Sequence, residues 1–91
     1  MAETVRRRVV VHGLVQGVFF RESLRRLAVE CGLAGFARNL PDGSLEAAFE
    51  GEEGAVRELV QFAHAGPPDA QVERLEVIEE LPESLSGFRI T

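Results

Sequence analysis

The sequence contains no lysine and a single cysteine, and each shortage excludes a class of chemistry. Without lysine the chain cannot carry a Walker A phosphate loop, which requires a Gly-Lys-Ser/Thr segment. With Cys31 as its one thiol, it cannot form an internal disulfide or a metal site built from several thiolates. This cysteine usage is typical of a reducing compartment, so we expect a cytoplasmic protein.

Long hydrophobic runs are absent as well. Hydrophobic residues make up 45% of the 91 positions, which is enough for a folded core. No stretch approaches the roughly 20 apolar residues that a membrane-spanning helix needs. A chain of this length forms one small domain. We therefore expect a single domain over residues 1–91, monomeric and without a membrane partner.

Charge is distributed unevenly along the chain, although the total is only -5. Residues 1–40 carry seven arginines against three glutamates, a net charge of +4, whereas residues 41–91 carry three arginines against twelve acids, a net charge of -9. A locally positive end suits a small anion better than nucleic acid, whose binding requires many phosphate contacts. We interpret the run Arg6-Arg7-Arg8 as a solvated strand end that adds to this positive potential.

Hydrophobic spacing predicts six main elements. They are, in order, a strand over 5–12, a helix over 20–31, a strand over 35–40, a strand over 45–49, a helix over 52–65 and a strand over 72–80. The first strand is apolar on both faces, which indicates a central position in the sheet. Gly32 ends the first helix, the turn Pro41-Asp42-Gly43 joins a hairpin, and Gly51 ends the second strand of that hairpin.

The end of the chain is less regular. Val72, Leu75 and Val77 cannot all lie on one face of a regular strand, so we expect a β-bulge there. Phe88 and Ile90 predict a further short strand at an edge of the sheet. Neither feature changes the order of the main elements.

This order predicts an α+β fold, a ferredoxin-like βαββαβ sandwich. Its sheet would be mainly antiparallel with strand order 4-1-3-2, a short fifth strand at the edge, and both helices on one face. The crossover through the first helix makes strands 1 and 2 parallel, so their C-terminal ends lie at the same edge. With the third strand between them, Asn39 would lie about 9–10 Å from the first strand.

The segment from Gly13 to Arg21 connects the first strand to the first helix and contains two glycines. Such a connection presents backbone N–H groups and a helix N-terminus to an anion. Gly13 suits the tight connection itself, whereas Gly17 would let an anion approach the backbone closely. Between its ends the segment has no Ser, Thr, Cys, His, Asp, Glu or Lys to act as nucleophile or base. Its chemistry would therefore consist of holding a ligand in place.

Several motifs, in this order and spacing, resemble the signatures of the acylphosphatase family. They are Gly13-Leu14-Val15-Gln16-Gly17-Val18-Phe19-Phe20-Arg21, Gly32-Leu33, Gly35-Phe36-Ala37-Arg38-Asn39 and Asp42-Gly43. The first is the most specific, because the pattern G-x-V-Q-G-V-x-F-R fixes seven of nine positions. The resemblance covers nearly the whole chain. It implies the ferredoxin-like sandwich and the hydrolysis of acyl phosphates without a metal or other cofactor.

By the same resemblance, Arg21 would bind the phosphoryl group and Asn39 would position the attacking water. The phosphate would rest on a loop whose backbone amides matter more than its side chains; the loop is formed by Val15, Gln16, Gly17, Val18, Phe19 and Phe20. The partners would be a small acyl phosphate as substrate and inorganic phosphate as product.

The residues themselves fit this assignment. Phosphoryl transfer requires mainly positioning and the stabilisation of charge on the phosphoryl oxygens. Arginine can bind two phosphate oxygens at once, and asparagine can orient a water although it cannot act as a base at neutral pH. Such a site cannot expel a poor alkoxide. It favours a substrate whose leaving group is a carboxylate, and an acyl phosphate is that substrate.

Three positions depart from the family pattern. Phe36 stands where tryptophan is usual and Ala37 where valine is common, and both are apolar replacements. Leu40 stands where a threonine often follows the asparagine. It removes a hydroxyl near Asn39, so we expect a secondary hydrogen bond to this asparagine to be missing.

Other interpretations remain open. The chain could be a non-catalytic ferredoxin-like module that binds an anion or RNA, but RNA binding would need aromatic side chains on the central strands, where the first offers Arg8, Val9 and Val10. It could also resemble the acylphosphatase-like domain of a carbamoyl-transfer maturation protein, which would be fused to much more chain. His12, His64 and Cys31 are assigned no catalytic role.

Overall fold

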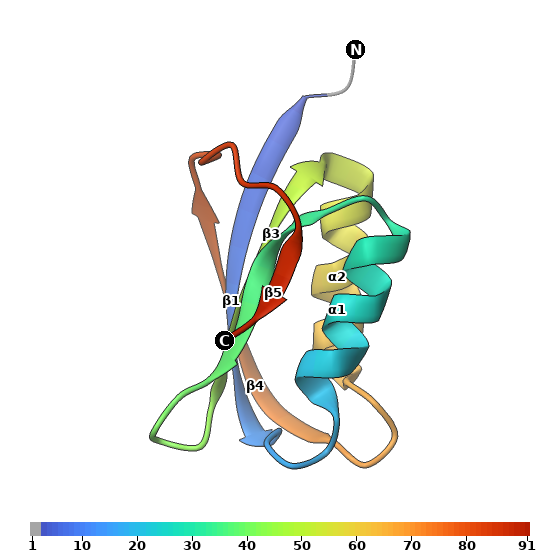
Figure 1. The fold of residues 1–91 in the computed structure, drawn as a ribbon. Helices are drawn as coiled ribbons and strands as arrows, with labels where there is room; N and C mark the ends of the chain where they lie inside the picture. The colour runs from blue at the N-terminus through green and yellow to red at the C-terminus, as the bar shows by residue number, and fades with distance from the viewer. Residues whose placement is uncertain (1–2) are drawn as a thin grey trace.

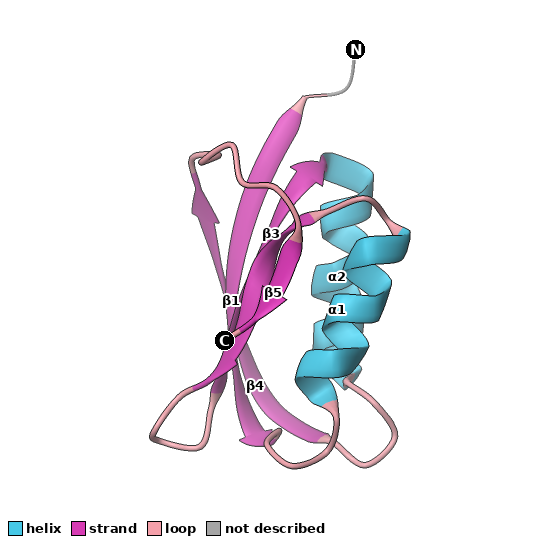
Figure 2. Ribbon diagram, in the orientation of Figure 1, coloured by secondary structure: helices cyan, strands magenta, loops and turns pink. Residues whose placement is uncertain are grey.

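The computed structural model describes residues 3–91 and places five strands and two helices in them. They are β1 (Thr4–Leu14), α1 (Phe20–Glu30), β2 (Ala34–Asn39), β3 (Leu45–Glu52), α2 (Glu53–Ala65), β4 (Gln71–Glu80) and β5 (Phe88–Ile90). The strands form one sheet in the order β4-β1-β3-β2-β5. Both helices cover the same face of this sheet (Figure 1, Figure 2). The predicted ferredoxin-like sandwich is confirmed, including the fifth strand at the edge.

Strand β1 occupies the centre of the sheet, as its apolar sequence predicted. It pairs antiparallel with β3 on one side and with β4 on the other. The side chains of Val9 and Val11 point to the helical face and are fully buried. Strand β2 pairs antiparallel with β3 and parallel with β5, so β1 and β2 run in the same direction with β3 between them.

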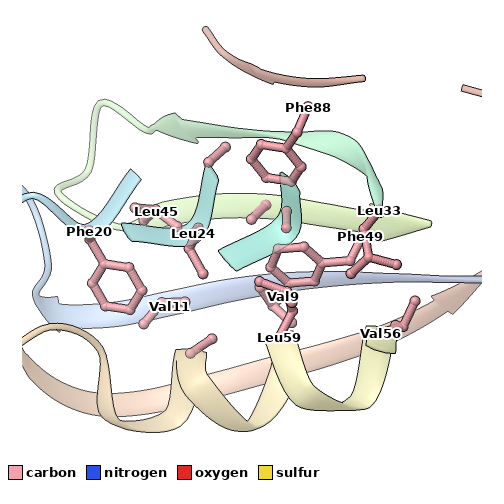
Figure 3. Packing of buried hydrophobic residues seen from close by; sticks show 14 of the residues in the cluster. Val9, Val11, Phe20, Leu24, Leu33, Leu45, Phe49, Val56, Leu59 and Phe88 are labelled. Carbon is pink, nitrogen blue, oxygen red and sulfur yellow. The ribbon is translucent and has the colours of Figure 1, made fainter. Parts of the chain in front are cut away.

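The hydrophobic core lies between the sheet and the two helices (Figure 3). Helix α1 contributes Phe20 and Leu24, and α2 contributes Leu59; these three side chains are at most 1% exposed. The ring of Phe49 stacks on that of Phe88 with centroids 6.0 Å apart, which attaches the short strand β5 to the core. Within residues 3–91 no helix has both the length and the hydrophobicity needed to cross a membrane.

Strand β4 contains the predicted bulge. Its register against β1 shifts at Glu73, which has no partner on β1 whereas Val72 and Arg74 do. The extra residue brings Val72 onto the same face as Leu75 and Val77. Two of these three side chains, Val72 and Leu75, pack against the core.

Gly13 is the β1 residue next to this bulge. Its φ is 127°, and a Cβ at this position would lie 2.2 Å from the carbonyl oxygen of Gln71. Glycine is therefore required by the close approach of β1 and β4. This agrees with the expectation that Gly13 serves the connection rather than a ligand.

The prediction that Gly51 ends the third strand is wrong. Strand β3 continues to Glu52, whose side chain caps helix α2 by accepting a hydrogen bond from the Gly54 N–H at 3.0 Å. Gly51 is instead a strand residue beside Leu33, and a Cβ on it would lie 2.5 Å from the Leu33 side chain. The glycine makes room for a core side chain instead of breaking the strand.

The face of the sheet opposite the helices carries a network of arginines and glutamates. Arg8 binds Glu46 and Glu80, each at 2.9 Å, and Arg38 binds Glu46 at 2.7 Å. Arg6 binds Glu80 at 2.9 Å and is only 4% exposed. The interpretation of Arg6-Arg7-Arg8 as a solvated, positively charged strand end is therefore wrong, because carboxylates of neighbouring strands neutralise it.

Glu50 is the most deeply enclosed acid of this network, with 4% of its surface exposed. Its carboxylate accepts hydrogen bonds from the N–H groups of Glu83 at 2.7 Å and Leu85 at 2.9 Å, which hold the segment between β4 and β5. Burial by itself would raise the pKa of Glu50. The two backbone N–H groups and Arg6 outweigh that effect and hold this pKa below its ordinary value.

We expect Glu50→Gln to lower the free energy of unfolding at pH 7 by about 1.5–3 kcal/mol, since it removes charge-assisted hydrogen bonds. A depressed folded-state pKa contributes stability above the unfolded pKa, and that contribution is lost as pH falls through the folded value. The difference between wild type and variant should therefore shrink below about pH 4. Urea denaturation at pH 7 and pH 3 measures both quantities.

Glu79→Gln is the matched control, because Glu79 lies on β4 with its side chain 81% exposed and meets Arg7 at 3.5 Å. It should leave stability unchanged at both pH values. Equal stability of Glu50→Gln and wild type at pH 7 would contradict the role given to Glu50.

Candidate functional site

Two connections meet at one end of the sheet. The loop over 15–19 follows β1 and the turn over 40–44 follows β2, and both lie at the lower end in Figure 1. Leu45 of β3 faces Val11 of β1 on one side and Asn39 of β2 on the other. Asn39 is therefore two strand spacings from β1, about 9–10 Å, which is the separation that the predicted topology required.

A pocket of about 350 Å³ lies between the loop over 15–19, the first turn of α1 and the ends of β2 and β5. It is lined by Val15, Gly17, Phe19, Phe20, Arg21, Glu22, Asn39 and Ile90. The structure thus brings Arg21 and Asn39 together with four of the six predicted loop residues. Gln16 and Val18 do not line it; Val18 packs against the core instead.

The loop backbone has a positive φ at two positions. Gly17 has φ 75° and Phe19 has φ 64°, both in the left-handed region. Apart from its two chain neighbours, no atom of residues 3–91 lies within 4 Å of a Cβ placed on Gly17, so this side of the backbone is open. Over residues 3–91, no backbone carbonyl accepts a hydrogen bond from the N–H groups of residues 16–22. These groups and the N-terminus of α1 together form a region of positive potential.

Arg21 has no ion pair within residues 3–91, which distinguishes it from most arginines of the chain. Seven of the ten arginines lie within 4 Å of a carboxylate; they are Arg6, Arg7, Arg8, Arg25, Arg26, Arg38 and Arg57. Arg21 is half-buried in the pocket wall and makes no such pair. Its guanidinium therefore keeps all five donors for a ligand.

The pocket also contains one acid, Glu22. Its carboxylate is bound by Arg25 and lies 3.5 Å from the Arg26 guanidinium. The hydrogen bond from Arg25 is the main cause that holds the pKa of Glu22 below its ordinary value. Glu22 is therefore ionised at neutral pH, and its carboxylate is paired with Arg25 and Arg26 in the next turn of α1.

Asn39 carries a buried acceptor that the protein does not use. Its Oδ1 atom has no hydrogen-bond partner among the residues that the structure describes. The neighbouring Leu40 contributes only backbone bonds, its N–H donating to the Ser44 carbonyl at 2.8 Å. An unpartnered buried oxygen is unfavourable for folding alone, and this atom is therefore free to accept a hydrogen bond from a ligand or water.

The side chain of Gln16 joins the two halves of the site, a role that the sequence analysis did not assign to it. Its Nε2 donates to the carbonyls of Leu40 at 2.8 Å and Ser44 at 2.9 Å. Asp42 closes the same turn by accepting from the Ser44 N–H at 2.9 Å. The only sequence signal for this contact was an amide side chain between Val15 and Gly17.

Other titratable groups lie outside the pocket. His12 bonds Glu76 at 2.7 Å and does not line the pocket. The part of the chain that the structure describes contains no group of three or more His, Cys, Asp and Glu side chains placed to hold a metal ion. The chemistry available in the pocket is thus anion binding by Arg21 and backbone N–H groups beside a free amide oxygen.

Comparison with known proteins gives a consistent picture. The family model described as Acylphosphatase matches residues 7–90. Acylphosphatases from Rubrobacter xylanophilus and Gloeobacter violaceus are 60% and 51% identical; the alignments cover 86% and 99% of this chain and 71% and 97% of those proteins. The structure of an acylphosphatase from Coxiella burnetii superposes with a TM-score of 0.92 at 39% identity, over 97% of this chain and 93% of that one.

We expect Gln16→Met to loosen the turn over 40–44, because it removes both donors while keeping the length of the side chain. The free energy of unfolding should fall by about 1–2 kcal/mol. Amide hydrogen exchange of Leu40 and Gly43, which close the turn, should become faster. Gln61→Met, on the exposed side of α2, is the control and should change neither quantity. Unchanged exchange in Gln16→Met would show that the turn does not depend on this side chain.

Proposed function

The chain belongs to the acylphosphatase family, hydrolases that act on acid anhydrides, and we propose that Arg21 and Asn39 carry out this reaction on an acyl phosphate. One pocket contains an arginine without an ion pair and an asparagine oxygen without a hydrogen-bond partner, both judged within residues 3–91, and this observation carries the proposal. The remaining steps follow from the groups around them.

Binding comes first. The phosphoryl group of the substrate is a dianion, and the N–H groups of residues 16–22 together with the N-terminus of α1 attract it. Arg21 contributes a planar guanidinium that can bind two of the phosphoryl oxygens. Gly17 allows this approach because it adopts a φ of 75° without strain and has no Cβ to stand in the way.

Attack follows from the position of Asn39. Its Oδ1 accepts a hydrogen bond from a water and directs the water oxygen at phosphorus. A new P–O bond forms with the water oxygen, and the bond between phosphorus and the acyl oxygen breaks. The carboxylate leaves with the electron pair, and the proton of the water passes to a phosphoryl oxygen. Arg21 and the N–H groups stabilise the charge that spreads over the equatorial oxygens.

The leaving group determines the substrate class. Glu22 is the one acid in the pocket lining, and its pairing with Arg25 keeps it ionised, so it cannot protonate a departing alkoxide. A carboxylate needs no such proton. The pocket therefore suits acyl phosphates and not phosphate monoesters.

A nucleic-acid-binding role is disfavoured by the open face of the sheet. The arginines at its centre, Arg6, Arg8 and Arg38, are already paired with Glu46, Glu50 and Glu80, whereas counterion release on nucleic acid requires free cations. Phe36 is the one aromatic residue of β2, and the guanidinium of Arg38 lies over its ring at 5.9 Å. We propose a monomeric, cytoplasmic hydrolase whose partners are its substrate and inorganic phosphate.

Arg21→Ala should weaken inhibition by inorganic phosphate and lower kcat/KM for acetyl phosphate by at least about 10²-fold, because the main charged donor is lost. Arg21→Lys should recover only a small part of the lost kcat/KM, since an ammonium lacks the planar pair of donors that binds two phosphoryl oxygens. Phosphate release assays in EDTA measure both effects. Arg74→Ala is the control, as Arg74 is exposed on β4, outside the pocket, and should leave all constants unchanged.

Asn39→Ala should lower kcat by about 10²-fold while the Ki for inorganic phosphate changes little, because water orientation is lost and phosphate binding is kept. Since Oδ1 has no partner among residues 3–91, the substitution should not lower the melting temperature. A kcat of Asn39→Ala equal to that of wild type would refute the role given to this amide.

A further inference from the structure

We propose that the side chains of Phe19 and Ile90 form an acyl-binding wall, and that the enzyme favours acyl phosphates with an apolar acyl group over small or charged ones. This inference rests on the proposed function, because it concerns the part of the same substrate that Arg21 and Asn39 do not hold. It is carried by the conformation of Phe19, by the composition of the pocket and by its size.

Phe19 breaks three local rules at once. It is a bulky residue with φ 64°, in a region that favours glycine or asparagine. Its side chain is 79% exposed, although it is a large aromatic. It also occupies the N-cap of α1 without a side-chain cap, where serine, threonine, aspartate or asparagine would bond the helix N–H groups.

An asparagine at position 19 would suit both the left-handed φ and the exposure. The stability of the fold therefore gives no reason for a phenylalanine there. Departures of this kind, where several local preferences are violated together, cluster at functional sites. The phosphoryl group does not explain Phe19 either, since its contacts are polar and involve the backbone of the loop.

The second wall residue comes from the opposite end of the chain. Ile90 lies on β5 and is 37% exposed, and it lines the pocket together with Phe19. Val15 and Phe20 also line it but are only 1% exposed, so they contribute little accessible surface. The accessible apolar surface of the pocket is thus supplied by Phe19 and Ile90, beside the polar groups of Arg21, Asn39 and the loop.

The size and charge of the pocket agree with an apolar acyl group. A volume of about 350 Å³ falls in the range of small-molecule sites. Arg21 is the one cation of the lining and is needed for the phosphoryl group, so a second negative charge on the acyl group would have no partner. Each methylene buried against the wall should raise affinity about fourfold.

The test compares benzoyl phosphate with acetyl phosphate in wild type and in Phe19→Asn. We expect the variant to melt at a higher temperature than wild type, because the asparagine suits the left-handed φ and the exposure. The KM for benzoyl phosphate should rise about tenfold, corresponding to the loss of a few buried carbon atoms. The KM for acetyl phosphate should change less than about threefold, and the Ki for inorganic phosphate should stay the same.

Two further variants sharpen the comparison. Ile90→Asn should lower the preference for benzoyl phosphate in the same direction. Leu14→Asn removes an exposed leucine, 52% accessible, that adjoins the loop but does not line the pocket, and it should leave the preference unchanged.

The outcomes separate the two proposals. If wild type hydrolyses both substrates and Phe19→Asn leaves their ratio of kcat/KM unchanged, the acyl-binding wall is refuted and the proposed function stands. A lower melting temperature of Phe19→Asn would also refute the wall, since Phe19 would then serve the fold. If wild type hydrolyses neither substrate, the proposed function fails and the wall fails with it.

Discussion

The whole site depends on one row of the sheet, in which Leu45 of β3 lies between Val11 of β1 and Asn39 of β2. This row requires β1 and β2 to run in the same direction, so the crossover through α1 must return the chain to the same edge. It leaves the loop over 15–19 and the turn over 40–44 facing each other. Gln16 then closes the remaining gap with its two hydrogen bonds to the turn. A change in register of either strand would separate Asn39 from Arg21.

Polar groups are paired differently on the open face of the sheet and in the pocket. On the open face the charges satisfy one another, as in the contacts of Arg8 with Glu46 and Glu80. In the pocket they do not, because Arg21 has no ion pair and the Asn39 oxygen has no partner among the described residues. Phe19 adds a strained backbone at the same place. Groups that a stable fold would pair are therefore collected in the pocket where we propose that the phosphoryl group binds.

Sequence patterns predicted the strand order, both helices, the bulge in β4 and the meeting of Arg21 with Asn39, because each depends on spacing or on topology alone. They failed where a side chain meets a partner distant in the sequence. The triple-arginine run is neutralised by glutamates 38 to 74 residues away, and no local pattern contains that information. The same holds for Ile90, which reaches the pocket from the last strand, and for the amide of Gln16. The prediction that Gly51 ends its strand failed because the local preference of glycine for a turn is outweighed by packing against Leu33.

The composition of the pocket lining has one more chemical consequence. An acyl phosphate has two electrophilic atoms, the phosphorus and the carbonyl carbon, and amines, thiols and hydroxyls attack the second readily. The lining offers none of these groups, since its side chains are hydrocarbon, a guanidinium, a carboxylate and an amide. Because the sequence contains no lysine, no side chain elsewhere in the chain carries an amine that could attack the substrate either. In the site that we propose, an activated acyl donor thus meets no amine, thiol or hydroxyl side chain that could accept its acyl group.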